Sequence, residues 1–256
     1  MTSSPEPALR VEDLEVVFSD ASGVVRALCN LSFSLQPNGF VTLIGPSGCG
    51  KSTLLRVIAG IVPPTKGRCR YNKDHPRIGM VFQNANLMPW RRVMENVSLP
   101  LELDSVSRDE IRERARELIQ LVGLEGFEGA YPRDLSGGMA QRVAIARSLM
   151  QDPDILLLDE PFGALDALTR ERMGDELLQI WQARRKTVLM VTHSIPEAIY
   201  LSDRVLVLSP RPGSIVLDLQ VTLPRPRTPD MHYTETFREL THTLRDQLRD
   251  AETYQS

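Results

Sequence analysis

The sequence predicts an α/β fold, and three observations support this prediction. The apolar run Phe40–Ile44 is followed by a glycine-rich loop and then by apolar residues at helical spacing, which is the order strand, loop, helix. Ile155–Leu158 is continuously apolar, as is typical of a strand inside a parallel sheet, and Thr187–Val191 is predicted to be another buried strand. From Leu9 to Leu35 polar and apolar residues alternate, which predicts an antiparallel β subdomain ahead of this core.

The middle of the chain predicts helices rather than strands. Ser107 to Glu110 has the form of a capping box, and an apolar stripe follows it as far as Gly123. The other face of this helix is charged, which is the ordinary solvated side of an amphipathic helix, so we assign it no chemistry. Residues 84–150 are therefore expected to form an inserted α-helical subdomain.

Composition narrows the classes of function. The chain has 256 residues, of which 42% are hydrophobic and 25% charged, and this suits one large α/β domain. The net charge of −3 gives no support for a nucleic-acid partner, because such proteins normally carry a concentrated basic field. The apolar runs are far shorter than the roughly 20 residues that cross a bilayer, so a membrane role would come through a partner. The three cysteines have no metal-binding spacing and are interpreted as free thiols.

The two ends of the chain are expected to lie outside the main domain. The first seven residues, MTSSPEP, have neither a basic region nor an apolar core, so they are interpreted as a short disordered tail and not as a secretory signal. The chain is therefore expected in the cytosol. Residues 224–256 contain three prolines and then a helical stripe made of Phe237, Leu240, Leu244 and Leu248. A helix packed back on the core is the preferred interpretation, and a dimer contact is the alternative.

The glycine-rich loop GPSGCGKST, Gly45–Thr53, fits the pattern G-x-x-x-x-G-K-[ST]. Glycines let successive backbone N–H groups turn around an anion, the following helix adds its positive end, and Lys51 supplies a charge for the outer phosphates. Ser52 is expected to hold Mg²⁺. The loop therefore predicts a P-loop NTPase (RecA-like) core. Cys49 precedes the helix and lies near Lys51, which predicts a lowered thiol pKa and a reactive thiol.

Polar side chains are expected to collect where the predicted strands end. Gln83 follows one apolar run, Asp159 and Glu160 follow a second, and His193 follows a third. Because the carboxyl ends of parallel strands share one edge of a sheet, these side chains are expected beside the phosphate loop. There Asp159 would orient Mg²⁺ through its water shell, Glu160 would accept a proton from the attacking water, and Gln83 would reach the metal or the water.

Two more features point to a nucleotide. Ser136 is a good N-cap, and the paired glycines Gly137 and Gly138 open the helix after it, so a second anion-seeking helix N-terminus is predicted. Phe18 stands among polar residues at the end of a predicted strand. Its ring would either stack on a purine base or pack in the core, and the local sequence leaves both open.

Together these features resemble the ATP-binding subunit of ABC transporters. The resemblance is carried by the phosphate loop, Gln83, LSGGMAQR at Leu135–Arg142, ILLLDE at Ile155–Glu160, ALD at Ala164–Asp166 and His193. It spans residues 8–223, which are thus expected to be the ABC ATPase domain, and it implies ATP and Mg²⁺ as cofactors.

The resemblance also implies a role for each site residue. Catalytic roles fall to Glu160 as general base, His193 at the γ-phosphate and Gln83, and the metal contacts would be Ser52, Gln83 and Asp159. Ser136 and Gly138 would bind the γ-phosphate of the opposite subunit, and Asp166 would cross between subunits. The implied ATP contacts are Phe18, Gly45, Pro46, Ser47, Gly48, Cys49, Gly50, Lys51, Ser52, Thr53, Ser136, Gly137, Gly138 and Asp166.

Two segments narrow the resemblance to importers of nitrate, sulfonate, taurine and related small compounds. They are QNANLMPWRRVMENVSLPL, Gln83–Leu101, and LSPRPGSI, Leu208–Ile215. This subfamily implies a homodimer on the cytoplasmic face of the membrane as a peripheral subunit, joined to permease subunits and, through them, to a solute-binding protein outside. The exposed apolar set expected near Asn84 to Trp90 is the predicted permease contact.

Two rival classes share parts of this pattern. A soluble non-transport ABC ATPase of the DNA repair or translation type would carry the same motifs, but only 82 residues separate Thr53 from Ser136, which leaves no room for long coiled-coil arms. A kinase or GTPase-type switch shares the phosphate loop alone and gives no reason for the serine-glycine-glycine motif.

Overall fold

The computed structural model describes residues 6–20, 23–102, 104 and 106–253, and these divide into two units. One unit is formed by Met1–Pro76 with Lys186–Ser256, and the other by Arg77–Arg185. Most of the tail predicted for residues 1–7 lies outside the described residues. Among the residues that the structure describes, no helix combines the length and apolar character needed to cross a membrane.

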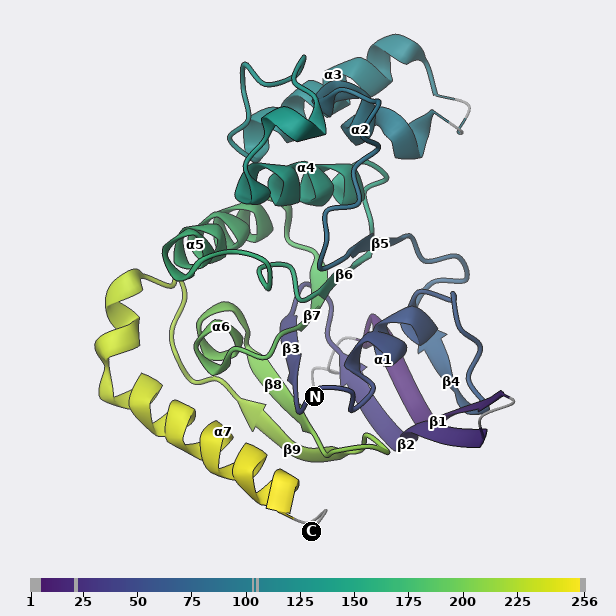
Figure 1. Ribbon diagram of the computed structural model, residues 1–256, viewed down its shortest axis with the longest axis vertical. Helices are drawn as coiled ribbons and strands as arrows, with labels where there is room; N and C mark the ends of the chain where they lie inside the picture. Colours follow the sequence, from purple (N-terminus) through teal and green to yellow (C-terminus); the bar gives the residue numbers. More distant parts are fainter. Residues whose placement is uncertain (1–5, 21–22, 103, 105, 254–256) are drawn as a thin grey trace. The chain divides into compact units, whose positions relative to one another are not determined.

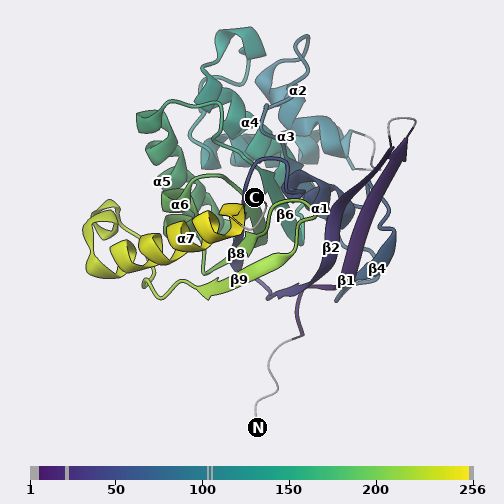
Figure 2. The same cartoon turned by 60° about the horizontal axis from the view of Figure 1, so that its bottom comes forward.

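The first unit opens with a three-stranded antiparallel sheet (Figure 1). Its strands are β1 (Leu9–Asp20), β2 (Gly23–Leu35) and β4 (Lys66–Tyr71), in the order β2-β1-β4. Figure 2 shows β1 and β2 running side by side as a long ribbon. Alternate side chains of β1 are buried, as the period of two predicts, so the expected antiparallel β subdomain is confirmed.

The same unit contains a second group of strands, in the order β7-β3-β8-β9. β3 (Phe40–Ile44) lies parallel to both β7 (Thr187–Val191) and β8 (Arg204–Leu208), while β9 (Ile215–Gln220) runs antiparallel to β8. Every residue of β3 and β7 is buried. This explains why both runs are apolar apart from the buried Thr42 and Thr187, because a central parallel strand has no face in contact with water.

Helices α1 (Lys51–Ile58), α6 (Ile195–Leu201) and α7 (Glu235–Thr253) complete this unit, together with the short 3-10 turn Pro229–Tyr233. α7 contacts α6, β8 and β9, and Phe237, Leu240 and Leu244 of its stripe are buried (Figure 2). The apolar stripe of α7 thus faces other elements of the same unit.

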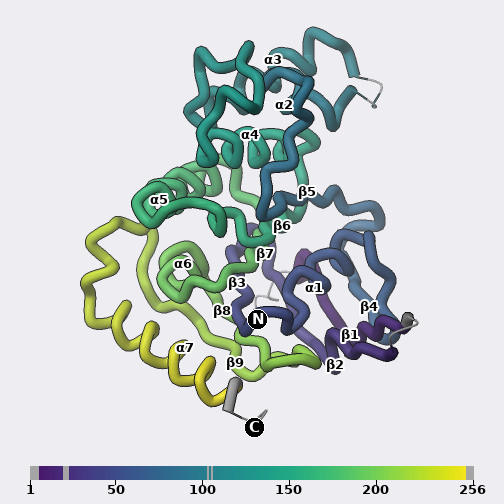
Figure 3. The backbone as a smooth tube through the Cα atoms, viewed as in Figure 1, coloured from purple at the N-terminus to yellow at the C-terminus, as the bar shows by residue number. Residues whose placement is uncertain are grey.

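The second unit is mainly helical (Figure 3). Its two strands, β5 (Ile78–Val81) and β6 (Ile155–Asp159), pair in parallel. The helices are α2 (Val93–Ser98), α3 (Arg108–Leu121), α4 (Gly137–Leu149) and α5 (Ala167–Arg184), with 3-10 turns at Leu99–Leu101 and Pro132–Asp134. Ser107 caps α3 by accepting a hydrogen bond from the Glu110 amide, as the capping box predicts. The α/β fold with its antiparallel sheet and helical region is thus confirmed.

Candidate nucleotide-binding site

The phosphate loop of the first unit lies between the end of β3 and the start of α1. Gly48 and Gly50 have φ values of 73° and 106°, a left-handed conformation that glycine adopts without strain. A Cβ atom on Gly50 would lie 2.6 Å from Leu28 Cδ2 and 2.8 Å from the Ala27 carbonyl oxygen. The loop therefore curls tightly against β2 before α1 begins, and no larger residue fits at Gly50.

Lys51 begins α1 and is only 7% exposed. Its ammonium group donates to the carbonyl oxygens of Gly45 and Pro46, both at 2.8 Å. A buried cation needs such partners, because its unpaired burial would be strongly unfavourable. These two bonds fold the side chain back over the loop, so the positive charge stays with the backbone N–H groups that a phosphate would meet.

The pKa of the Cys49 thiol differs from the one expected from the sequence. The thiol is 1% exposed, and burial raises its pKa more than the nearby Lys51 charge lowers it. The predicted lowered pKa is therefore wrong, because the helix N-terminus and the lysine do not offset the loss of water around the sulfur.

His193 follows β7 at the same sheet edge as the phosphate loop. β3 and β7 are parallel neighbours with Leu43 opposite Val191, so their carboxyl ends lie together. The buried Thr192 fixes the turn: its hydroxyl donates to Glu197 at 2.6 Å and accepts a hydrogen bond from the Ser194 amide. The structure thus brings the exposed His193 to the edge that carries the phosphate loop.

Phe18 lies near the end of β1, opposite Val25 of β2. Phe18 is 45% exposed, so its ring is not enclosed in the core, and its stacking on a base stays a prediction.

In the second unit, the side chains of Gln83 and Glu160 both lie close to Gly163. Strands β5 and β6 pair with Val81 opposite Leu158, so the residues that follow them share an edge. A Cβ atom on Gly163 would lie 3.1 Å from Gln83 Nε2 and 3.5 Å from Glu160 Oε2. The structure therefore brings the amide and the carboxylate together, and Gly163 leaves space between them.

Asp159 and Glu160 differ in their environments. Asp159 ends β6 and is buried, whereas Glu160 is partly exposed and has a φ of 46°. A left-handed glutamate costs conformational energy, and such residues cluster at functional sites.

The serine-glycine-glycine motif begins α4, as expected. Ser136 caps the helix by accepting a hydrogen bond from the Met139 amide at 3.3 Å. Asp166 caps α5 in the same way, and hydrogen bonds from the Thr169 hydroxyl and amide hold the pKa of its carboxyl below the usual value. A Cβ atom on Gly138 would lie 3.2 Å from the Thr169 methyl carbon, so the paired glycines let the two helix starts approach each other. Both caps, Ser136 and Asp166, are exposed.

The sequence analysis missed several residues that hold these groups in place. Thr192, Asn96, Arg147 and Arg211 all bond to backbone groups of segments that carry predicted site residues. For Arg211 a signal was present, since it stands in the segment LSPRPGSI, and for Thr192 the adjoining capping box was the signal.

A glycine loop between a strand and a helix, a buried lysine folded over it and acids at a strand end define a phosphate-loop nucleoside triphosphatase. The family model described as ABC transporter matches residues 28–163. The chain belongs to the ABC transporter family, and it is an ATPase of that family.

Three relatives carry importer names. The aliphatic sulfonates import ATP-binding protein SsuB of Bacillus cereus is 44% identical over 90% of this chain and 91% of its own length. The taurine import ATP-binding protein TauB of Rhizobium johnstonii is 50% identical over 81% and 82%, and the nitrate import ATP-binding protein NrtD of Synechocystis is 48% identical over 84% and 83%. The suspected resemblance to this importer subfamily is confirmed.

A solved structure extends the comparison. The dimeric post-hydrolysis state of the ATP-binding cassette MJ0796, bound to ADP and Pi, matches with a TM-score of 0.72 and 32% identity, over 84% of this chain and all of the other. A relative holding the products of ATP hydrolysis supports the ATPase assignment and ATP as the bound nucleotide.

Proposed function

We propose that this chain is the ATP-hydrolysing subunit of an ABC importer for a small anionic or zwitterionic solute of the sulfonate, taurine or nitrate kind. The observation that carries the proposal is the similarity, at 44–50% identity over most of the chain, to subunits named for importing those three solutes. These names favour an importer over the alternative of a DNA repair or translation ATPase.

The phosphate loop would bind the β- and γ-phosphates of ATP. Its inward N–H groups, the N-terminus of α1 and the Lys51 ammonium group supply the positive field, and Phe18 would stack on the adenine. The remaining loop residues, Gly45, Pro46, Ser47, Gly48, Cys49, Gly50, Ser52 and Thr53, would contact the phosphates through their backbone or hydroxyl groups.

The residues that the family pattern assigns to Mg²⁺ carry suitable ligand atoms. Ser52, Gln83 and Asp159 offer hydroxyl, amide and carboxylate oxygens, the hard ligands that Mg²⁺ prefers alongside phosphate oxygens and water. When bound, the ion would neutralise charge on the β- and γ-phosphates.

Glu160 is proposed as the general base. Its carboxylate would take a proton from the attacking water while the water oxygen forms a bond to the γ-phosphorus and the bond to the β-phosphate oxygen breaks, giving ADP and phosphate. His193 would donate to a γ-phosphate oxygen, and Gln83 would help to hold the water. The proximity of Gln83 and Glu160 around Gly163 supports this shared task.

A second copy of the chain is the proposed partner for ATP. Ser136, Gly137 and Asp166 are exposed at the starts of α4 and α5, and the buried Gly138 lies directly behind them, which supports the use of this set on the nucleotide of an opposite subunit. Each ATP would then join two chains.

The proposed permease contact is the segment 84–90 of the second unit. Trp90 is 72% exposed, which is unusual for so large an apolar side chain. A subunit bound to a permease in this way would lie at the cytoplasmic face of the membrane, and it would reach a solute-binding protein only through the permease.

Uptake measurements test the solute class. A strain lacking this subunit is expected to lose high-affinity uptake of at least one of labelled taurine, an alkanesulfonate or nitrate, and the intact gene should restore it while the Lys51→Ala variant should not. Unchanged uptake of all three solutes in the deletion strain would overturn the proposed solute class.

A further inference from the structure

The turn between β8 and β9 packs against the phosphate loop of the same unit. The Gly213 amide donates to the Ala27 carbonyl oxygen at 3.0 Å, and the Cys29 amide donates to the Gly213 carbonyl oxygen at 3.0 Å. A Cβ atom on Gly213 would lie 2.2 Å from the Cys49 carbonyl oxygen. The turn therefore lies in backbone contact with both β2 and the phosphate loop.

Arg211, at the tip of this turn, makes the most specific contact. Its Nε and Nη2 atoms both donate to the Gly48 carbonyl oxygen, at 3.0 and 2.9 Å. A guanidinium group is planar and permanently charged, so two donors directed at one oxygen hold that oxygen more firmly than a neutral partner would.

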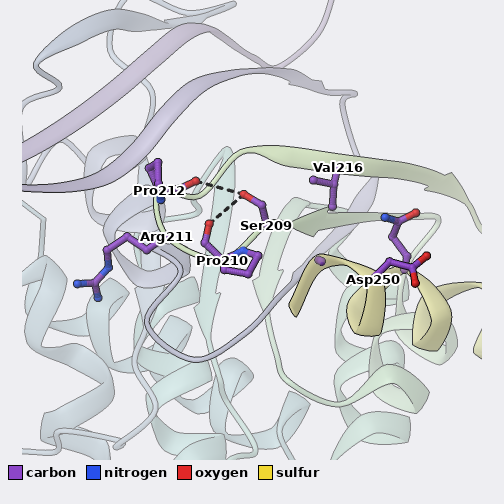
Figure 4. Close-up of a pocket in the computed structure, with 8 residues that line it drawn as sticks. Ser209, Pro210, Arg211, Pro212, Val216 and Asp250 are labelled. Carbon is purple, nitrogen blue, oxygen red and sulfur yellow. Dashed lines mark hydrogen bonds between the residues drawn. The ribbon is translucent and has the colours of Figure 1, made fainter. Parts of the chain in front are cut away.

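Hydrogen bonds within the turn also stabilise it. The Ser209 hydroxyl lies within hydrogen-bond distance of the Pro210 and Pro212 carbonyl oxygens and accepts a bond from the Ser214 amide. A pocket beside the turn is lined by turn residues and by Val216 of β9 and Asp250 of α7. Figure 4 shows the Arg211 side chain pointing away from Val216 and Asp250. Arg211 thus extends from a supported turn.

The contact with Gly48 fixes one peptide plane of the loop. Because a trans peptide is planar, the carbonyl oxygen of Gly48 and the N–H of Cys49 point in opposite directions. Arg211 holds the oxygen on the outside. The Cys49 N–H then faces the loop interior, where it makes a long bond of 3.3 Å to the Pro46 carbonyl oxygen that a phosphate oxygen can replace.

We propose that Arg211 is a positioning residue for nucleotide binding: by holding the Gly48 carbonyl outward, it keeps the Cys49 N–H directed at the phosphates. This inference rests on the proposed role of Gly45–Thr53 as the phosphate-binding loop. The side chain acts through the loop backbone, so it strengthens ATP and ADP binding and leaves the hydrolysis step itself almost unchanged.

The test compares four variants of the full chain: Arg211→Met, Arg211→Lys, Arg245→Met as a matched control and Lys51→Ala. Arg245 is an exposed arginine of α7 in the same unit, so its replacement removes the same charge without touching the turn. Dissociation constants for fluorescent ATP and ADP, kcat, KM and the midpoint of thermal unfolding are measured for each.

Arg211→Met is expected to weaken the binding of both ATP and ADP and to raise KM for ATP about tenfold. Its kcat should stay within about twofold of that of the original chain. Arg211→Lys should recover part of the affinity, because an ammonium group can still donate to the Gly48 oxygen. Arg245→Met should bind as the original chain does. Faster amide hydrogen exchange at Cys49 in Arg211→Met would show directly that the peptide has lost its restraint.

Three results would overturn the inference: unchanged affinity in Arg211→Met, an equal loss in Arg245→Met, or a loss that tracks a lowered unfolding midpoint. Failure of the loop assignment is separate, since it would appear as normal ATP binding by Lys51→Ala whatever Arg211→Met does.

Discussion

Asn96 and Met88 exchange two hydrogen bonds, from the Met88 amide to Asn96 Oδ1 at 2.8 Å and from Asn96 Nδ2 to the Met88 carbonyl oxygen at 3.2 Å. Nδ2 also donates to the carbonyl oxygens of Arg91 and Arg92. The Asn96 side chain is fully buried. Its amide pairs with the N–H and C=O groups of the Met88 backbone, as a neighbouring strand would in a β-sheet. The exposed Trp90 therefore projects from a turn whose backbone groups are bonded to the buried Asn96 side chain.

Asn96→Ala is expected to lower the free energy of unfolding by about 2 to 3 kcal/mol, because several buried backbone groups would lose their partner at once. Urea unfolding measures the change. Asn84→Ala, which truncates an exposed asparagine of the same segment, should shift the free energy by less than about 0.5 kcal/mol. Equal stability of the two variants would mean that Asn96 does not hold the turn.

Trp90→Ala and Leu87→Asp are expected to abolish assembly with the permease while ATP binding by the isolated subunit is unchanged. The reason is that a large exposed apolar side chain at a partner surface supplies much of the binding energy. Co-purification from membranes measures assembly. Phe127→Ala serves as the control, since Phe127 is another exposed aromatic residue of the same unit, and intact complexes in all three variants would refute the docking segment.

Glu160→Gln is expected to accumulate as an ATP-bound dimer. Binding depends on the loop, Lys51 and Mg²⁺, whereas hydrolysis needs a base, and losing a general base slows the step by about 10² to 10⁴. Size-exclusion chromatography with light scattering, with and without ATP, measures the assembly. Glu171→Gln, at an exposed position of α5, should turn ATP over and stay mainly monomeric.

Adding Ser136→Arg to Glu160→Gln should remove this dimer without preventing ATP binding by the monomer, because the defect lies in the half-site offered to the partner. If Glu160→Gln retains ATP and yet stays monomeric, the shared-site proposal fails for the isolated subunit.

Brief alkylation at pH 8 is expected to label Cys29 before Cys49 and Cys69. Cys29 is half-buried, whereas the Cys49 thiol is enclosed and its pKa is raised, so little of it is thiolate at this pH. Burial also raises the pKa of Cys69 to about 11. Raising the pH should therefore increase labelling of Cys69 steeply up to about pH 11. Mass-spectrometric mapping gives the order, and fastest labelling at Cys49 would contradict the burial argument.

Local patterns were enough to predict the elements that carry the chemistry. The loop Gly45–Thr53, the apolar run ending at Asp159 and the cap at Ser136 are each encoded within a few consecutive residues, so spacing alone identified them. Their preference for strand, turn or helix is strong because residue type and neighbours agree.

Contacts between distant segments could not be predicted in this way. Cys49 looked activated because a helix N-terminus and a lysine are visible in the sequence, whereas the burial that outweighs them depends on how β2 and the turn before β9 pack around the loop. Arg211 and Gly48 are 163 residues apart, and no local pattern says that a guanidinium group will meet that carbonyl. The same holds for Arg147, which bonds to the carbonyl oxygens of Ala85 and Asn86.

If Ser136 contacts a nucleotide as proposed, its cap would link the stability of α4 to nucleotide occupancy. A serine hydroxyl has two lone pairs and one proton, and capping of α4 uses only a lone pair. The proton stays available to a phosphate oxygen, and a hydroxyl that donates becomes a better acceptor, since hydrogen bonds in a chain polarise one another. A phosphate bound there would strengthen the bond from the Met139 amide, so the first turn of α4 would open less often in the nucleotide-bound dimer than in the free subunit.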